Sequence, residues 1–363
     1  MRWSLSLGRI LGIRVLVHWT FFLLIAWVVL VEYSRGRDIS GILITTTYVL
    51  SIFACVVLHE MGHALMARRF NVPTKKITLL PIGGVASLQR IPERPKEELL
   101  VAVAGPLVNV VIAAIIFPFL GPLSNYIPEE EAAGAFAAIT LDNFWFALFS
   151  INIILVLFNL IPAFPMDGGR MLRSILAMRM NRLKATHIAS SIGQFLAVLF
   201  FFAGLFLNPF LLLIGVFVFF GARGENIMVQ QYEILRGHYV HEAMMTDLQT
   251  FDPDTPVKEV TQHIMSSCDD TFLVVDDGET RGWVTRNQLL QELKENHGEK
   301  KLKDILSNHY DTIDPDEKLS KVMEMMQGSK QKVYPVMKER QLKGILNFAG
   351  LQRFIAVQSA LNL

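Results

Sequence analysis

This chain carries at Ile42–Met66 the apolar stretch ILITTTYVLSIFACVVLHEMGHALM, which is long enough to cross a bilayer and contains the motif His59-Glu60-Met61-Gly62-His63. Two histidines four positions apart lie on one face of a helix, so both imidazoles can reach one metal ion. Glu60 then lies next to a metal-activated water and can accept its proton. Ionisable side chains are costly in lipid and usually functional there. The stretch therefore predicts a metal centre within a membrane helix.

The composition divides the chain into two unlike parts. Of its 363 residues, 52% are hydrophobic and 18% are charged, but the long apolar runs fall almost entirely within residues 15–222. Residues 223–363 read like an ordinary soluble protein. The net charge of +1 gives no reason to expect a nucleic-acid partner. Cys55 and Cys268 lie in different parts, so no disulfide framework is expected.

We expect a polytopic α-helical membrane domain of about six transmembrane helices in lipid, followed by a soluble α/β module. The first apolar run lies behind three arginines and lacks a small-residue cleavage site, so it predicts a retained helix rather than a signal peptide. The sixth span is short and is joined to the fifth only by the turn Asn208-Pro209. The expected spans are Val15–Val31, Ile42–Met66, Leu99–Leu120, Leu141–Pro162, Ile188–Leu207 and Phe210–Gly221.

Basic residues predict the orientation of the membrane domain. If the N-terminus is cytoplasmic, the inner segments hold many Arg and Lys, whereas the outer loops hold only Arg35 and Arg37, and the loop 121–140 holds none. This asymmetry satisfies the positive-inside rule and places the C-terminal module in the cytoplasm, at the cell membrane if the protein is bacterial. Arg68 follows His63 by five residues, about 7–8 Å along a helix. The metal is therefore expected within the membrane, near its cytoplasmic face.

A third metal ligand is expected, because zinc in hydrolases usually takes three protein ligands and leaves one position for water. The best intramembrane candidate is Asp167, in the segment NLIPAFPMDGG at residues 159–169. Pro162 and Pro165 break the fourth helix, and the paired glycines let the backbone turn sharply. A broken helix at membrane depth needs shelter from protein or a cavity. The alternative is that Asp167 is an interfacial loop carboxylate or caps the next helix.

The motif HExxH, followed by N-x-x-P-x-x-P-x-D-G on a later helix, resembles the site-2 protease family of intramembrane zinc metalloproteases. The resemblance covers roughly Leu5–Gly221. It implies one zinc ion per chain, bound by His59, His63 and Asp167. It also implies that Glu60 is the catalytic base and that Asn159 donates a hydrogen bond to the oxyanion or the substrate. For Asn159 the alternative is a polar contact between helices.

Two further segments fit the same family. The segment Gly105-Pro106-Leu107-Val108-Asn109 resembles the G-x-x-x-N segment of the middle helix, and we interpret it as mainly structural because small residues permit close packing. Lys75–Arg90 alternates like a short sheet, and in the family this region offers an edge to the substrate. A substrate strand added at Gly83–Leu88 would satisfy the backbone groups that unwinding exposes.

Residues 239–363 contain an internal repeat. Asp252-Pro253-Asp254 recurs as Asp314-Pro315-Asp316, and Gly282 recurs as Gly344 at the same offset. The repeated unit resembles a tandem pair of CBS domains, which often associate in twos, so a homodimer through this pair is expected. The expected boundaries are 1–223 for the membrane domain, 224–238 for a linker, and 239–299 and 300–363 for the two CBS domains.

The sequence leaves nucleotide binding by the CBS pair open. The family signature is G-h-h-[ST]-x-x-D, in which the Asp holds the ribose of an adenine nucleotide. The first copy ends in Gln288, and the second replaces both polar positions by Asn347 and Gly350. Thr285 is the best surviving candidate for a nucleotide contact. The competing role is dimerisation or substrate docking without a ligand.

The leading hypothesis is a zinc-dependent endopeptidase that cuts in or next to the transmembrane segments of regulatory membrane proteins, with a CBS pair that regulates or dimerises it. The alternative is a CBS-gated ion transporter or channel, in which the intramembrane His, Glu and Asp residues line an ion path. HExxH with a remote Asp beside a helix break, and the lack of a visible inverted repeat, disfavour that alternative. The intact catalytic positions disfavour a catalytically silent relative.

Overall fold

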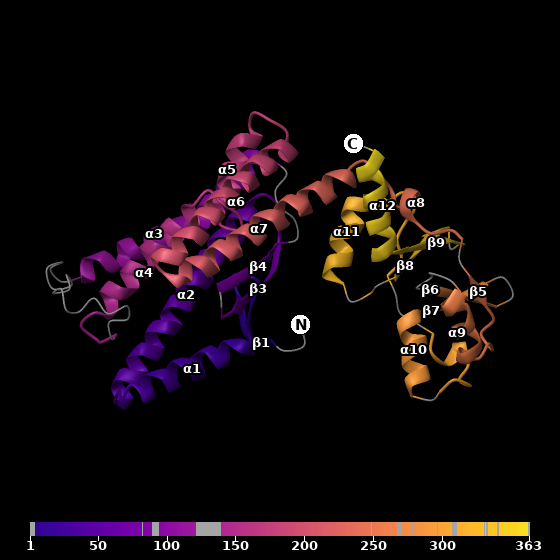
Figure 1. Ribbon diagram of the computed structural model, residues 1–363, viewed down its shortest axis with the longest axis horizontal. Coiled ribbons are helices and arrows are strands. Elements are labelled where there is room, and N and C mark those ends of the chain that lie inside the picture. The colour runs from indigo at the N-terminus through magenta and orange to yellow at the C-terminus, as the bar shows by residue number, and fades with distance from the viewer. Residues whose placement is uncertain are drawn as a thin grey trace. The chain divides into compact units, whose positions relative to one another are not determined.

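The computed structural model describes residues 4–81, 83–88, 94–120, 139–247, 249–266, 271–276, 279–295, 297–306, 311–329, 331, 333–339 and 341–361. The outer loop expected at 121–140 lies outside the described residues up to position 138. The chain divides into two compact units, Met1–Val229 and Gln230–Leu363. The first is mainly helical, and the second mixes short helices with short strands (Figure 1).

A small sheet forms the first layer of the membrane unit. Its strands follow one another in the order β1 (Ser4–Ile10), β2 (Ile13–His18), β3 (Thr74–Leu80) and β4 (Gly83–Leu88). β2 pairs in parallel with β3, and the two outer pairs are antiparallel. The sheet expected within Lys75–Arg90 is therefore present as far as Leu88, and β4 is an edge strand among the described residues.

The first expected span, Val15–Val31, is wrong at its start. Val15 belongs to β2, and the first helix, α1, runs only from Thr20 to Ser34. The side chains of Ile13, Val15 and Val17 are buried and their neighbours are more exposed, which is the period of two of a strand. Run length alone does not separate this strand from the helix that follows it, because both are apolar.

Seven helices follow in the described part of the first unit. They are α1, α2 (Ile39–Arg69), α3 (Pro95–Ile116, continued by the 3₁₀ turn η1, Phe117–Phe119), α4 (Phe144–Leu160), α5 (Asp167–Ala177), α6 (Arg182–Phe206) and α7 (Pro209–Ile234). Among them α2, α3 with η1, α6 and α7 are long and apolar enough to cross a membrane, while α1 and α4 are apolar but shorter. The polytopic helical class is confirmed, and the second to sixth expected spans each coincide with a helix.

The last of these helices is longer than expected. The sixth span is expected at Phe210–Gly221 and a linker at 224–238, but α7 continues unbroken to Ile234. Arg223 and Glu225 enter the helix without ending it. The fall in hydrophobicity after Gly221 marks the end of an apolar run rather than the end of a helix, which is why the sequence suggests too early a boundary.

α3 is the central helix of the membrane unit. It packs against α2, α4 and α5, and α5 packs in turn against α6. The close approach of α2 to α3 depends on Gly62, since a Cβ atom there would lie 2.7 Å from the carbonyl oxygen of Ala104 and 2.8 Å from Val108 Cγ2. Small residues permit such contacts between membrane helices. α3 therefore touches both helices that carry the expected metal ligands.

The second unit contains the two copies of the expected repeat. Its elements are α8 (Val240–Ala243), β5 (Thr250–Phe251), α9 (Val257–Ser266), β6 (Thr271–Asp276), β7 (Glu279–Thr285), α10 (Arg286–Lys294), η4 (Leu302–Asp304), α11 (Leu319–Gly328), β8 (Val333–Lys338), β9 (Gln341–Asn347) and α12 (Phe348–Leu361). Val274 pairs with Gly282 between β6 and β7, and Val336 pairs with Gly344 between β8 and β9. The offset of the repeat is thus kept in the strand register.

Each copy has its own apolar core, and a further cluster joins the two. The equivalent residues Val260 and Val322 are fully buried, one in each core. Leu273 of β6 packs with Val333 and Ile345 of the second copy's sheet. The expected α/β module is therefore confirmed, and its two halves share buried apolar surface.

Candidate metal centre

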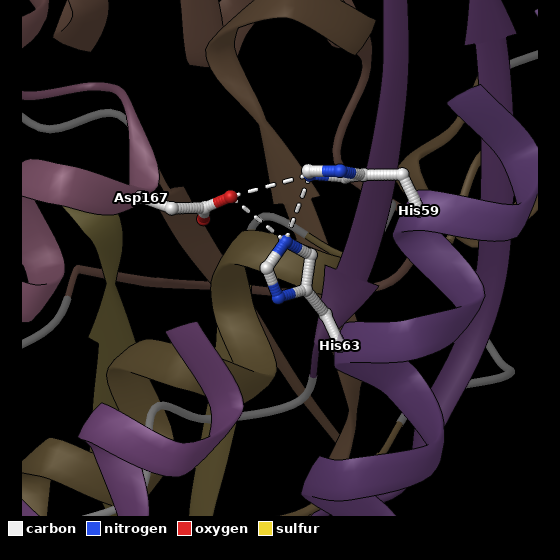
Figure 2. A group of neighbouring side chains, drawn as sticks. All are labelled: His59, His63 and Asp167. Carbon is white, nitrogen blue, oxygen red and sulfur yellow. Dashed lines mark hydrogen bonds and ion pairs between the residues drawn. The ribbon is translucent and has the colours of Figure 1, made fainter. Parts of the chain in front are cut away.

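α2 places both histidines of the HExxH motif on one face. The residues His59 and His63 are buried, with 7% and 4% of their surface exposed, and their Nε2 atoms lie 3.1 Å apart. The spacing of four residues brings the rings together because neighbouring turns of a helix stack such positions. Both rings reach from α2 toward the same point (Figure 2).

Asp167 meets these two nitrogens from another helix. Its Oδ2 atom lies 3.2 Å from His59 Nε2 and 3.0 Å from His63 Nε2 (Figure 2). Asp167 is the first residue of α5 and is also buried. The N-cap of α5 is Met166, so the Asp167 carboxylate reaches across to α2 and does not occupy the capping position that was its alternative role. The three candidate ligand atoms form a nearly equilateral triangle.

The chemistry and spacing of this triangle fit zinc. Two imidazole nitrogens and one carboxylate oxygen are ligands that zinc takes in catalytic sites, where the remaining position is left for water. Tetrahedral bonds of about 2.0–2.1 Å put neighbouring ligand atoms about 3.3 Å apart. The distances between the three atoms here are 3.0, 3.1 and 3.2 Å. His59, His63 and Asp167 can therefore hold one zinc ion.

The outer nitrogen of each ring has its own acceptor. His59 Nδ1 lies 2.5 Å from Asn109 Oδ1, and His63 Nδ1 lies 2.7 Å from the carbonyl oxygen of Val101. A carbonyl oxygen can only accept, so each Nδ1 carries the proton and donates it. Each Nε2 then presents its lone pair to the triangle. Such partners orient the rings and select the tautomer that binds a metal.

Asn109 is itself held in place by a second buried amide. Its Nδ2 donates to Asn152 Oδ1 at 2.8 Å, and Asn152 Nδ2 donates to the carbonyl oxygen of Leu148 at 2.8 Å. This chain fixes which end of the Asn109 amide is the oxygen, because its nitrogen is used elsewhere. Asn109, expected from the sequence to be mainly structural, therefore orients a candidate ligand. Its one signal in the sequence is a polar amide within an apolar helix.

Gly105 leaves room for both rings. A Cβ atom at this position would lie 2.7 Å from His59 Nε2 and closer still to the ring of His63. Atoms do not approach so near without displacement, so a larger residue would push the rings from their places. The G-x-x-x-N segment of α3 thus packs closely, as expected. In addition, its glycine, Gly105, lies against the rings of His59 and His63, and its asparagine, Asn109, accepts a hydrogen bond from His59.

The two glycines after Asp167 act through close approach rather than through backbone freedom. Both lie within the helix α5, and neither has a positive φ. A Cβ atom on Gly169 would lie 2.6 Å from the backbone of Ala163, and one on Gly168 would meet the carbonyl group of Leu160. The sharp turn expected at these glycines is therefore not their role. They let the break after α4 fold back against the first turn of α5, which carries Asp167.

The two expected catalytic residues differ in their surroundings. Glu60 lies on α2 beside the triangle, is partly buried, and is within electrostatic reach of all three candidate ligands. Asn159 Nδ2 donates at 2.9 Å to the carbonyl oxygen of Leu155, on the same helix α4. Because an amide nitrogen carries two N–H groups, Asn159 has a second N–H that can donate to a substrate while this bond within α4 stays closed.

The nucleotide-signature positions of the CBS pair serve helix capping. Thr285 is the N-cap of α10, and its hydroxyl donates to Gln288 Oε1 at 2.7 Å. Gln288 Nε2 in turn donates to the carbonyl oxygen of Ile305 at 3.5 Å. In the second copy, Asn347 Oδ1 accepts a hydrogen bond from the N–H of Gly350 at 2.7 Å. The polar groups at the signature positions thus have partners within the CBS module.

Comparison with known proteins gives matches to both units. The family model of peptidase family M50 matches residues 47–130 and 121–201, and the CBS domain model matches residues 240–295 and 302–356. The chain is 32% identical to the zinc metalloprotease MJ0392 of Methanocaldococcus jannaschii over 287 aligned residues, and this alignment covers 78% of each chain. Among solved structures, the site-2 protease from the same organism is 36% identical, covers 62% of this chain and 95% of its own, and has a TM-score of 0.44.

Proposed function

We propose that this chain, which belongs to peptidase family M50, the site-2 protease family, hydrolyses peptide bonds in or next to the transmembrane segments of regulatory membrane proteins. The membership confirms the resemblance drawn from HExxH and the later Asp-Gly motif. The chain is an integral membrane protein and a site-2-type zinc metalloprotease with a C-terminal CBS pair.

One observation carries the proposal, namely the convergence of three ligand atoms at a buried point. The Nε2 atoms of His59 and His63 and the Oδ2 atom of Asp167 lie within 3.2 Å of one another. We assign one zinc ion to them. An ion path needs polar groups spaced along it, and it gives no reason for two ring nitrogens pinned by outer acceptors. The triangle therefore favours the protease over the CBS-gated transporter or channel.

The chemistry of peptide hydrolysis divides between the ion and the chain. Zinc, when bound, lowers the pKa of water and polarises a carbonyl group. We assign Glu60 as the base that accepts the proton of the attacking water and then delivers it to the leaving amine. Asn109 keeps the ring of His59 in its tautomer throughout. We assign Asn159 as a donor to the substrate's oxyanion, through the second N–H of the amide that bonds to Leu155.

The edge of the small sheet is the proposed docking place for the scissile segment. A helical substrate hides its carbonyl groups, and in lipid each freed backbone group costs several kcal/mol unless it finds a partner. β4 can supply partners by strand addition, because it is an edge strand. Gly84→Pro disturbs this edge and should slow cleavage. Unchanged cleavage by that variant would rule out strand addition at β4.

The proposed orientation places the N-terminus, the metal-proximal end of α2 and the CBS pair in the cytoplasm. The two arginines at the end of α2, Arg68 and Arg69, support it, since basic residues gather on the cytoplasmic side. Single cysteines at Arg37 and Arg94 should react with an impermeant maleimide from opposite sides of the membrane. Labelling of both from one side contradicts the orientation.

The CBS pair is proposed to regulate or dimerise the protease. Thr285 and Gln288 bond to each other, which favours dimerisation or substrate docking over a nucleotide contact at this position. An adenine nucleotide would have to break that capping bond to use the Thr285 hydroxyl as a donor. Titration of the full chain with ATP and AMP, together with its mass in detergent, tests the choice. Saturable binding that Thr285→Ala abolishes would restore the nucleotide site.

The deciding experiment pairs metal content with cleavage. The full chain and Glu60→Gln are purified in detergent, their zinc is quantified, and each is incubated with single-span membrane proteins. About one zinc per chain in both, with cutting by the native chain only, is the expected result. Absence of zinc from the native chain, with an ion flux in liposomes that Asp167→Ala removes, would instead support the transporter.

A further inference from the structure

A second buried polar cluster lies in the same unit, and its centre is Arg173. The side chain of Arg173 has no exposed surface, although arginine is almost never fully buried unless it is paired. Two of its nitrogens donate to Glu98 Oε1: Nε, at a distance of 2.9 Å, and Nη2. Its third nitrogen, Nη1, donates to Glu225 Oε1 at 2.5 Å. The guanidinium carbon lies 5.0 Å from the ring centroid of Phe164. Arg182 approaches the other oxygen of Glu98 at 3.5 Å, so the four charges balance.

This cluster holds the helix that carries Asp167. Arg173 lies on α5, six residues after Asp167, and α5 has only 11 residues. Its two carboxylate partners come from α3 and α7, and Phe164 belongs to the break that leads into α5. The guanidinium therefore ties the short helix to two longer ones and to the segment that precedes it. A rotation or shift of α5 would break these bonds and move Asp167 at the same time.

One face of α3 serves all three candidate ligands. Glu98, Val101, Gly105 and Asn109 follow at spacings of three, four and four residues, so they lie on the same side of the helix. Asn109 accepts the bond from His59, and the Val101 carbonyl accepts the bond from His63. Glu98 supports the third candidate ligand, because it accepts bonds from Arg173 on α5, the helix that carries Asp167. α3 thus supplies none of the candidate ligands, but it orients both histidines directly and Asp167 through Arg173.

Stability alone does not explain a buried cluster of this kind. Replacing buried ion pairs by apolar groups of similar size is often neutral or stabilising, because desolvation offsets much of the attraction. Apolar packing could hold α5 against α3. A planar guanidinium with several donors also fixes the orientation of the helix, because its hydrogen bonds are directional. A metal site needs its ligand atoms held to within about 0.5 Å. The directional bonds of Arg173 meet that need.

We propose that Arg173, with Glu98 and Glu225, positions α5 so that Asp167 Oδ2 meets the two histidine nitrogens. The inference rests on the proposed metal site, and Arg173 acts through Asp167 without touching the ion. Its loss should leave all three ligands present but loosely placed. Metal affinity should then fall by about 10- to 100-fold, the range found for residues that support metal ligands.

The test uses a variant that removes the three most buried charges of the cluster together and leaves only Arg182, whose side chain is 25% exposed. This charge-free variant carries Arg173→Met, Glu98→Gln and Glu225→Gln in the full-length chain. The matched control is Glu97→Gln, which removes the neighbouring carboxylate of α3 and its surface pair with Arg94. The zinc dissociation constant, the visible spectrum of the Co²⁺-loaded protein and the melting temperature of the metal-free form are measured for each.

The expected result separates positioning from mere stability. The charge-free variant should bind zinc about 10- to 100-fold more weakly and show an altered Co²⁺ spectrum, with Glu97→Gln matching the native chain in both. Arg173→Lys, which keeps the charge but not the fork, should recover part of the affinity. Native affinity and a native spectrum in the charge-free variant overturn the inference, even if its metal-free form melts lower. A native chain that binds neither ion overturns the proposed function, and this inference with it.

Discussion

The membrane unit holds two buried polar clusters that are encoded in the sequence in opposite ways. The ligand triangle takes two members from neighbouring turns of α2 and the third from a segment with fixed proline and glycine spacing. The Arg173 cluster joins side chains that lie 75 and 52 positions apart, and no motif surrounds them. The triangle can be found before the chain is folded, whereas the Arg173 cluster can be found only afterwards.

The difference follows from what each cluster must do. A metal accepts few kinds of donor in few geometries, so residue type and spacing are restricted. A cluster that fixes helices relative to one another can use many different pairs, and its members are close only because the helices pack. We therefore expect changes in the triangle to abolish metal binding, and changes in the contacts that the fold creates to weaken it by degrees.

The largest effect is expected from Asp167→Ala. This change removes a ligand rather than the support of one, so zinc affinity should fall by more than the about 100-fold limit typical of supporting residues. Cleavage should become undetectable, while Glu60→Gln loses cleavage but keeps its zinc. Zinc content by mass spectrometry and cleavage of a single-span substrate measure both. Asp167→Ala with full zinc content would show that the triangle is not the metal site.

Gly105→Ala should have the next largest effect, although it changes no polar group. The added Cβ atom would lie 2.7 Å from His59 Nε2, so the rings must move and zinc affinity should fall at least about 100-fold. The same change should raise the helix propensity of α3 by up to about 1 kcal/mol. Gly224→Ala on α7 is the control, since a Cβ atom there meets nothing within 4 Å. Native zinc affinity in Gly105→Ala would mean that the histidine rings can accommodate a Cβ atom at position 105 without leaving their metal-binding positions.

Asn109→Ala should give a graded loss. It leaves His59 in place without an acceptor for its Nδ1 proton, so zinc should bind about 10- to 100-fold more weakly. Asn109→Asp keeps an acceptor for His59, as carboxylates that hold metal-binding histidines do, but it sets a carboxylate oxygen against Asn152 Oδ1 in place of the donated bond. Its loss of zinc affinity should be smaller than that of Asn109→Ala. Competition with a chromophoric chelator measures the dissociation constants. Equal losses in the two variants would indicate that packing, not the hydrogen bond, is what Asn109 provides.

The sequence predicts those features that depend on local spacing. HExxH places His59 and His63 on one helical face, and the proline and glycine pattern identifies Asp167 as their partner. The repeat also predicts the CBS pair, because Val274 and Val336 occupy equivalent buried strand positions. In each case residues of one kind recur at a spacing set by the helix turn or by the repeated unit, so the pattern can be recognised in a single sequence.

The features that the sequence does not predict depend on contacts between distant segments. Nothing near Asn109 indicates that it meets His59, and nothing near Arg173 indicates two carboxylates on other helices. The strand β2, which contains Val15, and the full length of the helix α7 are missed for a related reason. Apolarity reports burial in lipid or protein, and it does not distinguish a short strand from a helix or end a helix where lipid ends.

The smallest effect is expected at the exposed Asp254 cluster, a carboxylate with two lysines, which contrasts with the buried Arg173 cluster. Asp254 Oδ1 lies 2.7 Å from Lys301 Nζ and 2.8 Å from Lys303 Nζ, all on the surface of the second unit. The hydrogen bonds and positive charges of Lys301 and Lys303 lower the pKa of Asp254 to about 2 from its ordinary 3.8. A lowered pKa stabilises the folded state at neutral pH, and this contribution is lost as the pH falls from about 4 to about 2.

Asp254→Asn should therefore melt slightly below the native chain at neutral pH and together with it below about pH 2. About 1 M salt should also remove the difference, because exposed pairs are screened. The difference in zinc affinity between the native chain and the charge-free variant should persist in the same salt, since salt does not screen the buried bonds of Arg173 in the native chain. If salt lowered the zinc affinity of the native chain to that of the charge-free variant, burial would not be what distinguishes the Arg173 cluster from the exposed Asp254 cluster. The Arg173 cluster would then act through its charge alone.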